Sequence, residues 1–291
     1  MSSETLLKQQ SIGTKIVEGT ISDTVADDDG NAMSLVVDPL KFPPPSLFSR
    51  ISKALILPVI TMIALPFLFY IAITKFDIFY ETFSKATAEP SIQEAKENKD
   101  SEQLLVRLWQ SRTGKLFKAS LEYQKSEGYC CSATQRCLLK SIPGMDIQSL
   151  PEQKRAPATV QKFAQSIDEM SNGATTSSVI LGSDGFESFL GAVKRVNDPN
   201  VRIALNFLRS PLFGVNKPVF LPFNWLLCFF GGHFSPVVGY FEDVNSVAVF
   251  DVNHKYSFFF VSPERLWQAV NTHDVSSGKA RGIIVVEVVD K

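Results

Sequence analysis

Two apolar runs joined by a short acidic turn constrain the fold of this chain more than any other sequence feature. The first run covers residues 231–240, the second covers residues 246–251, and the turn between them at 242–245 reads Glu-Asp-Val-Asn. This pattern predicts two antiparallel strands connected as a hairpin. Because a hairpin brings its outer ends together, we expect His233 at the start of the first strand to lie beside Asp251 at the end of the second.

An imidazole beside a carboxylate is the geometry of a general base and its orienting partner. The carboxylate fixes the tautomer of the ring and stabilises the imidazolium that forms when the ring takes a proton. Taken singly, a histidine such as His233 is usually a loop or core residue, and an aspartate such as Asp251 is usually a turn former. A nucleophile elsewhere in the chain favours the catalytic interpretation of the pair.

The most informative cysteine context begins at residue 130. The chain has four cysteines, Cys130, Cys131, Cys137 and Cys228, with no C-x-x-C pair and no Cys/His ligand spacing. This argues against a structural zinc site and against a disulfide framework. The apolar spacing that follows predicts a helix that begins at or just before Cys130. Because a helix N-terminus stabilises a thiolate, Cys130 is a candidate nucleophile, and its neighbour Cys131 is the alternative.

The composition changes sharply along the first third of the chain. Residues 1–53 are polar and rich in Ser and Asp, which predicts a disordered tail. Residues 54–74 contain no charged residue over 21 positions, long enough for a helix to cross a hydrocarbon core of about 30 Å. We expect a single-pass membrane protein; a buried core helix of a soluble protein is the alternative. A polar linker is expected at 75–101 and one catalytic domain at 102–291.

Within this domain the sequence favours an α+β fold, with the helix of Cys130 packed against an antiparallel sheet that carries the histidine and the aspartate. Residues 143–200 are expected to form helices and loops on the substrate side, with a helical patch at 186–190. Strands are expected at 258–261 and 282–289, and Ser262 is expected to cap a helix that contains Trp267.

Two motifs resemble a known family. Residues 129–134 read Tyr-Cys-Cys-Ser-Ala-Thr, and residues 232–236 read Gly-His-Phe-Ser-Pro, with Asp251 eighteen residues after the histidine. Together they resemble the catalytic domain of phytochelatin synthases, in the papain-like cysteine peptidase clan. Trp267 and the segment at 277–282 are similar to the family as well. The resemblance covers roughly residues 115–289 and implies a papain-like fold.

The resemblance implies a role for each motif residue. Cys130 is the nucleophile, His233 is the general base and then the acid, and Asp251 orients the imidazole. Gln124, six residues before Cys130, matches the oxyanion-hole glutamine of the family, and this spacing favours Cys130 over Cys131 as the nucleophile.

The implied activity is that of a membrane-anchored glutathione γ-glutamylcysteinyltransferase or deglycylating cysteine peptidase. It works through a γ-glutamylcysteinyl thioester on Cys130, with glutathione or a related γ-glutamyl peptide as the substrate. We expect no intrinsic cofactor and no metal site of the protein itself; Cd or Zn enters as a thiolate complex of the substrate. The formal net charge of −1 gives no bulk attraction to nucleic acid, so no nucleic-acid partner is expected.

One departure from the family concerns the substrate. After Asp251 and Val252 the family usually shows a small residue and then an arginine, whereas this chain continues with Asn253, His254 and Lys255. A cation for a substrate carboxylate is therefore missing at that place. Two alternatives stay open: a papain-like protease or deconjugating peptidase with a different peptide substrate, and an inactive membrane-tethered binding module.

Overall fold

A six-stranded antiparallel sheet forms the centre of the protein. The computed structural model describes residues 73–92, 101–156, 158–214 and 231–289, together with 24–26, 32–34 and a few single positions between 59 and 70. The strand order is β3-β10-β4-β5-β6-β7, and each neighbouring pair is antiparallel. The strands are β3 (Thr175–Leu181), β10 (Gly282–Val288), β4 (Val201–Leu208), β5 (Gly232–Phe241), β6 (Ser246–Phe250) and β7 (Phe258–Val261).

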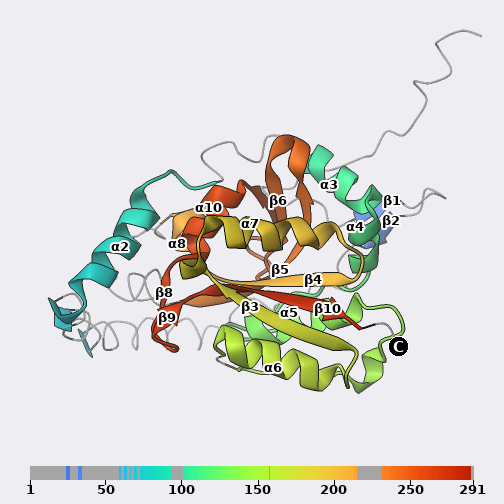
Figure 1. Ribbon diagram of the computed structural model, residues 1–291, viewed down its shortest axis with the longest axis horizontal. Helices are drawn as coiled ribbons and strands as arrows, with labels where there is room; N and C mark the ends of the chain where they lie inside the picture. Colours follow the sequence, from blue (N-terminus) through green and yellow to red (C-terminus); the bar gives the residue numbers. More distant parts are fainter. Residues whose placement is uncertain are drawn as a thin grey trace, which may run out of the picture.

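Helices cover both faces of this sheet, as Figure 1 shows for α5 and α6 on one side and α7 and α10 on the other. One core joins the sheet to α3 (Ser101–Gln110), α4 (Arg112–Phe117), α5 (Cys130–Lys140) and α6 (Val160–Met170). The second core joins it to α7 (Phe186–Lys194), α8 (Ser210–Phe213) and α10 (Pro263–Val270). The predicted α+β class is confirmed, although we did not expect a second helical layer behind the sheet.

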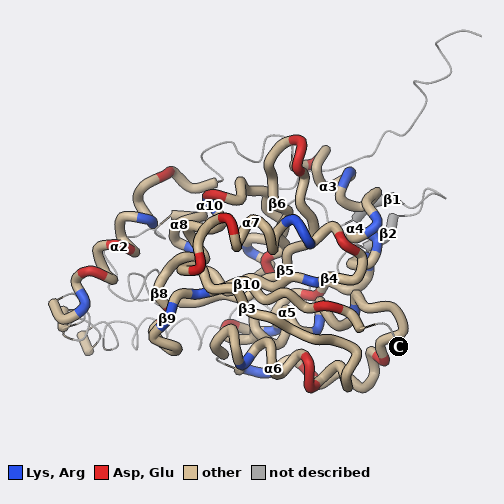
Figure 2. Tube along the Cα trace, viewed as in Figure 1, with Lys and Arg blue, Asp and Glu red and all other residues tan. Residues whose placement is uncertain are grey.

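Alternation of side chains along the strands builds these two cores. In β10, Ile284 and Val286 belong to the core of α5, whereas Ile283 and Val285 belong to the core of α7. Consecutive β-branched residues suit a strand buried on both faces. Within the six strands, Arg202 and Glu287 are the only Lys, Arg, Asp or Glu residues, and Figure 2 shows the charges gathered on helices and loops.

The predicted hairpin is confirmed. Strands β5 and β6 pair antiparallel, with Tyr240 opposite Val247, and a bulge interrupts the register near Val237. The turn contains a 3-10 segment, η4 (Glu242–Val244), and then Asn245 with φ 47° and ψ 50°. Asparagine tolerates this left-handed conformation better than most residues. Residues 242–245 therefore form the hairpin turn that their sequence predicts.

Other local predictions are confirmed as well. Strand β7 occupies 258–261, and α10 begins at Pro263, where the Ser262 hydroxyl accepts the backbone N–H of Arg265 at 3.4 Å. The patch at 186–190 is the first part of α7.

The prediction for 143–200 is wrong in one element. Residues 175–181 form the edge strand β3, which pairs with β10 along its whole length. Its first half reads Thr-Thr-Ser-Ser, so it carries little apolar signal of its own. The pairing partner lies about a hundred residues further along the chain, and β3 forms because β10 offers it an open edge. A short 3-10 turn, η1 (Ile147–Ser149), and the helices α6 and α7 fill the rest as expected.

The N-terminal third is described only in part. Two short strands, β1 (Thr24–Ala26) and β2 (Ala32–Ser34), pair within the predicted tail, and most of 1–53 lies outside the described residues. Most of the predicted membrane span at 54–74 also lies outside them. Among the helices that are described, we find none with the length and apolar character of a membrane span.

The predicted linker at 75–101 contains a helix, α2 (Phe76–Thr87), which packs on α8 of the domain. The Lys85 ammonium donates to the Asn271 carbonyl, and the Ile92 N–H donates to the Leu212 carbonyl at 2.9 Å. The linker is therefore partly ordered against the domain. A small ribbon of β8 (His273–Asp274) and β9 (Lys279–Ala280) precedes β10.

Candidate active site

The candidate catalytic side chains lie together where three neighbouring strands of the sheet begin or end. His233 is the second residue of β5, and Asp251 follows directly on the end of β6. Because neighbouring strands are antiparallel, the start of β5 and the ends of β4 and β6 meet at the same edge. Cys130 is the first residue of α5, which packs against β5. The topology therefore brings Cys130 together with His233 and Asp251, which lie more than a hundred positions further along the chain.

His233 and Asp251 form the predicted pair. The His233 Nε2 atom lies 2.7 Å from Asp251 Oδ1, and both side chains are buried. A carboxylate only accepts hydrogen bonds, so this contact places a proton on Nε2. The Asn253 N–H donates to the same oxygen at 2.8 Å and further fixes the carboxylate. The other ring nitrogen, Nδ1, is thus left as the base of the neutral imidazole.

An arginine completes the cluster. Arg209 follows directly on the end of β4 and donates two hydrogen bonds to Asp251, from Nε at 3.0 Å and from Nη2 at 2.8 Å. Its guanidinium also stacks on the Tyr256 ring, 4.5 Å from the ring centroid. Its Nη2 approaches His233 Nε2 to 2.8 Å, a contact between two protonated nitrogens that share one acceptor. The Asp251 carboxylate is therefore bonded both to the Arg209 guanidinium and to an imidazole that can take a positive charge.

Arg209 is not among the predicted site residues, although the sequence carries a signal for it. Arg209 directly follows the eight buried residues of β4 at 201–208. A polar residue that directly follows a buried strand lies at a sheet edge, where sites are usual. The local pattern of 201–208 does not show that this strand pairs with β5, so the sequence alone does not connect Arg209 to His233.

The charges of the cluster act on one another. Burial alone would raise the pKa of the Asp251 carboxyl, but the charges of Arg209 and His233 and their hydrogen bonds hold that pKa well below its usual range. Burial and the charge of Arg209 lower the pKa of His233, yet Asp251 and Cys130 raise it above its ordinary value. The carboxylate stays ionised, and the imidazole binds its proton more firmly than a free histidine.

Cys130 is the cysteine whose thiol pKa this cluster lowers. Burial would raise the pKa of its thiol, but the charge of His233, a hydrogen bond from its ring, the Phe234 N–H and the charge of Arg209 together hold that pKa below its ordinary value. The side chain of the N-cap residue Tyr129 does not cap α5, so among the described residues the N–H groups of the first turn remain available beside the thiol. Burial raises the pKa of both Cys131 and Cys137 to about 12, and Cys228 lies outside the described residues.

These pKa directions predict how alkylation of Cys130 depends on pH. Thiolate reacts and thiol does not, so the rate with iodoacetamide is expected to rise with a midpoint below that of an ordinary cysteine. In His233→Ala the midpoint is expected to move up, because burial remains while the charge and the hydrogen bond of the imidazole are gone. Mass spectrometry of the alkylated site at each pH measures this. Equal labelling of Cys130 and Cys131 in the folded protein would contradict it and favour an inactive binding module.

Gln124 lies beside this cluster. Its side chain is buried, and its backbone N–H donates to the carbonyl of Val252, the residue after Asp251, at 2.7 Å. The amide nitrogen reaches the Glu127 carboxylate only at 3.5 Å, and the amide oxygen has no partner among the described residues. A buried amide with such weak contacts remains able to donate to an oxyanion that forms at the site.

Comparison with known proteins relates this edge of the sheet to one family. A model of the phytochelatin synthase family matches residues 227–283, which include His233 and Asp251. The match supports the predicted resemblance to phytochelatin synthases over this segment, whereas Cys130 and Gln124 lie before it. A search of curated proteins found no significant match.

Proposed function

We propose that this protein is a cysteine acyltransferase or peptidase of the phytochelatin synthase type, with glutathione or a related γ-glutamyl peptide as its substrate. The observation that carries the proposal is the buried cluster at the sheet edge, in which His233 connects Cys130 to an ionised Asp251. The family match over residues 227–283 supports the substrate class. A papain-like arrangement of Cys, His and Asp is part of the same proposal.

In the proposed reaction, the Cys130 sulfur attacks the carbonyl carbon of the Cys-Gly amide, and the thiol proton resides on His233 Nδ1. The Gln124 amide and the Cys130 backbone N–H stabilise the oxyanion. The C–N bond then breaks, His233 returns its proton to the leaving amine, and glycine departs. The γ-glutamylcysteinyl thioester on Cys130 passes to the amine of a second glutathione or to water, whose proton His233 takes.

A buried arginine at the same edge supports a substrate that carries a carboxylate. Arg281 directly precedes β10 and is 1% exposed. Its Nη1 donates weakly to Asn206 and Asp274, at 3.3 Å and 3.4 Å, while its Nε and Nη2 have no partner among the described residues. The guanidinium lies against Gly232, the neighbour of His233, where any larger side chain would collide with it.

Two unused donors on a buried guanidinium suit a carboxylate, which accepts both in a fork. Glutathione carries two carboxylates, and an internal peptide segment of a protein offers none from its backbone. Arg281 therefore supplies a cation of the kind that the sequence lacks after Asp251. This favours a γ-glutamyl peptide over the substrate of a general protease.

Incubation of the purified full chain with glutathione tests the proposed function. Free glycine is expected, together with γ-glutamylcysteine or its transfer product, and Cd or Zn is expected to act through the substrate thiolate. Cys130→Ser serves as the control and is expected to release none. Absence of glycine from the folded wild-type protein, with and without metal, would overturn the proposal. Cleavage of peptide or isopeptide substrates in its place would support the protease alternative.

We also propose that the protein is anchored to a membrane by the segment at 54–74, which contains no charged residue. The start of α2 adds support, because Phe76 and Tyr80 are 60% and 62% exposed on one side of the helix. The buried Thr82 lies on the opposite side, toward the domain. Aromatic residues beside an apolar segment are typical of the membrane interface.

Extraction of membranes with alkaline carbonate tests the anchor. The full chain is expected to stay in the membrane pellet, because a spanning helix is not released by high pH. A variant that lacks residues 54–74 serves as the control and is expected in the supernatant. Release of the full chain into the supernatant would overturn the proposal.

A further inference from the structure

The side chain of Gln153 holds the backbone on both sides of Gln124. Its amide oxygen accepts the Lys125 N–H at 2.7 Å, and its amide nitrogen donates to the Tyr123 carbonyl at 3.0 Å. These are the two backbone groups that flank Gln124. On the other side, the Gln124 N–H is bonded to Val252. The residue that offers the oxyanion amide is thus fixed from two directions.

Gln153 is buried although its neighbours are not. It is 8% exposed, whereas Pro151, Glu152 and Lys154 all lie at the surface. An isolated amide that turns inward from an exposed segment needs partners inside, and its contacts to Tyr123 and Lys125 provide them.

The segment that carries Gln153 is itself attached to α5, the helix of Cys130. The Arg136 guanidinium donates to the carbonyls of Leu150 and Pro151, at 3.2 Å and 2.7 Å. The Ser132 hydroxyl donates to the Lys154 carbonyl at 2.8 Å and accepts the Lys154 N–H at 3.1 Å. The segment is therefore attached to α5 both before and after Gln153.

A buried carboxylate closes the network. Glu122 accepts the Gln153 amide nitrogen at 2.7 Å, the Arg136 Nε at 2.6 Å and the Lys140 ammonium. The two cations belong to α5, and Glu122 lies two residues before Gln124. Burial would raise the pKa of Glu122, but these hydrogen bonds and the charge of Lys140 hold it below the ordinary value. An ionised Glu122 thus links the α5 helix to the segment that carries Gln124.

We propose that Gln153 is a positioning residue that sets Gln124 in register with Cys130. It transmits the position of α5 to the backbone of Gln124 through side-chain hydrogen bonds, without touching the substrate. An oxyanion donor must lie within about 0.5 Å of its productive position, so such a clamp affects the rate more than binding. The inference rests on the proposed use of Gln124 as an oxyanion donor.

Acylation by p-nitrophenyl acetate tests this inference, because that ester acylates a reactive thiol whatever its natural substrate. Gln153→Ala is expected to slow the Cys130-dependent burst by about 10-fold to 100-fold. Gln124→Ala is expected to slow it by at least as much. The double variant is expected to be no slower than Gln124→Ala, because a clamp has no effect once the clamped amide is gone. Subtraction of the Cys130→Ser rate removes the background.

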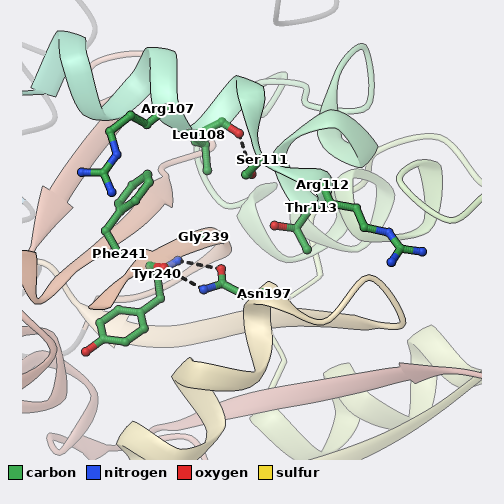
Figure 3. A pocket seen from close by; sticks show the side chains of 9 residues that line it. All are labelled: Arg107, Leu108, Ser111, Arg112, Thr113, Asn197, Gly239, Tyr240 and Phe241. Carbon is green, nitrogen blue, oxygen red and sulfur yellow. Dashed lines mark hydrogen bonds between the residues drawn. The ribbon is translucent and has the colours of Figure 1, made fainter. Parts of the chain in front are cut away.

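Alkylation by iodoacetamide is the second measurement, since that reaction develops no oxyanion. Its rate on Cys130 is expected to be unchanged in Gln153→Ala. Asn197→Ala is the matched control, because Asn197 makes the same kind of clamp on Tyr240, accepting its N–H at 3.2 Å and donating to its carbonyl at 2.7 Å. Figure 3 shows this clamp, which lines a cavity of about 290 Å³ bordered by α3, α4 and the end of β5. The burst is expected to be normal in Asn197→Ala.

Three results would overturn the inference: additive losses in the double variant, an equal loss of alkylation in Gln153→Ala, or an equal loss of burst in Asn197→Ala. A wild-type burst no larger than that of Cys130→Ser would overturn it together with the proposed chemistry. A normal burst without glycine release from glutathione would overturn only the proposed substrate.

Discussion

Cys130→Ser is expected to abolish turnover of glutathione while the protein stays folded. A serine hydroxyl is far less acidic than a thiol, and the charges of His233 and Arg209 that lower the pKa of Cys130 do not make an alkoxide available at neutral pH. The loss is expected to exceed about 10³-fold in kcat. Cys130 is only half-buried, so the smaller oxygen leaves little empty space and Tm is expected to change little. Glycine release and thermal unfolding of the same preparation measure both effects.

Cys131→Ser is the matched control. Its thiol is buried with a pKa raised to about 12, and its side chain belongs to the core rather than to the cluster. We expect most of the activity to remain and a moderate loss of stability from a buried hydroxyl. The reverse result, an active Cys130→Ser and an inactive Cys131→Ser, would show that the nucleophile is one residue further along the chain.

Local sequence patterns predicted the parts of the site that depend on neighbours in the chain. The hairpin of β5 and β6 places His233 beside Asp251 because one short turn closes it, and α5 begins at Cys130 because its apolar spacing starts there. These elements need no knowledge of distant partners. The same holds for the capped start of α10 at Ser262.

Long-range pairing determined the parts that the sequence did not reveal. Arg209 reaches Asp251 only because β4 lies next to β5, and Arg281 reaches the same edge only because β10 pairs with β4. The edge strand β3 exists because β10 offers it hydrogen bonds. Pairings between strands that are not consecutive are not encoded in a local period, so the cations of the site stayed unassigned.

In the proposed reactive state, the charges of the four ionisable groups in the cluster sum to zero. A thiolate on Cys130 and the carboxylate of Asp251 carry two negative charges, and the His233 imidazolium and the Arg209 guanidinium carry two positive charges. Removal of any one charge leaves an uncompensated partner in a buried place, which is costly. Asp251 is expected to show the largest effect, because it contacts both cations directly.

Asp251→Asn is expected to reduce both turnover and stability. The amide no longer stabilises the imidazolium by charge, and kcat is expected to fall by about 10³-fold to 10⁴-fold. Arg209 and His233 then repel each other without the carboxylate, at a cost of about 3 kcal/mol in the free energy of unfolding. The side chain of Arg209 is 22% exposed, so water reduces this cost in part. Asp251→Ala is expected to be worse, because it also removes the hydrogen bonds.

The stability gap between wild type and Asp251→Asn is expected to depend on pH. The folded-state pKa of Asp251 is depressed, so its contribution is fully present above the unfolded pKa of about 4 and is lost as the pH falls toward the folded value. Denaturant unfolding at pH 7 and at about pH 3 measures the gap, which is expected to narrow in acid. A gap that stays constant over this range would show that Asp251 does not stabilise the fold by its charge.

A second substitution separates the catalytic role of Asp251 from its structural role. Arg209→Met replaces the guanidinium by an uncharged side chain that can still pack on the Tyr256 ring, so the double variant Arg209→Met, Asp251→Asn has no unpaired arginine in the cluster. Its stability is expected to recover toward wild type, whereas its turnover is expected to stay low, because the imidazolium still lacks a carboxylate. If turnover recovered together with stability, Asp251 would act only by holding the fold, and Cys130 and His233 would work as a dyad.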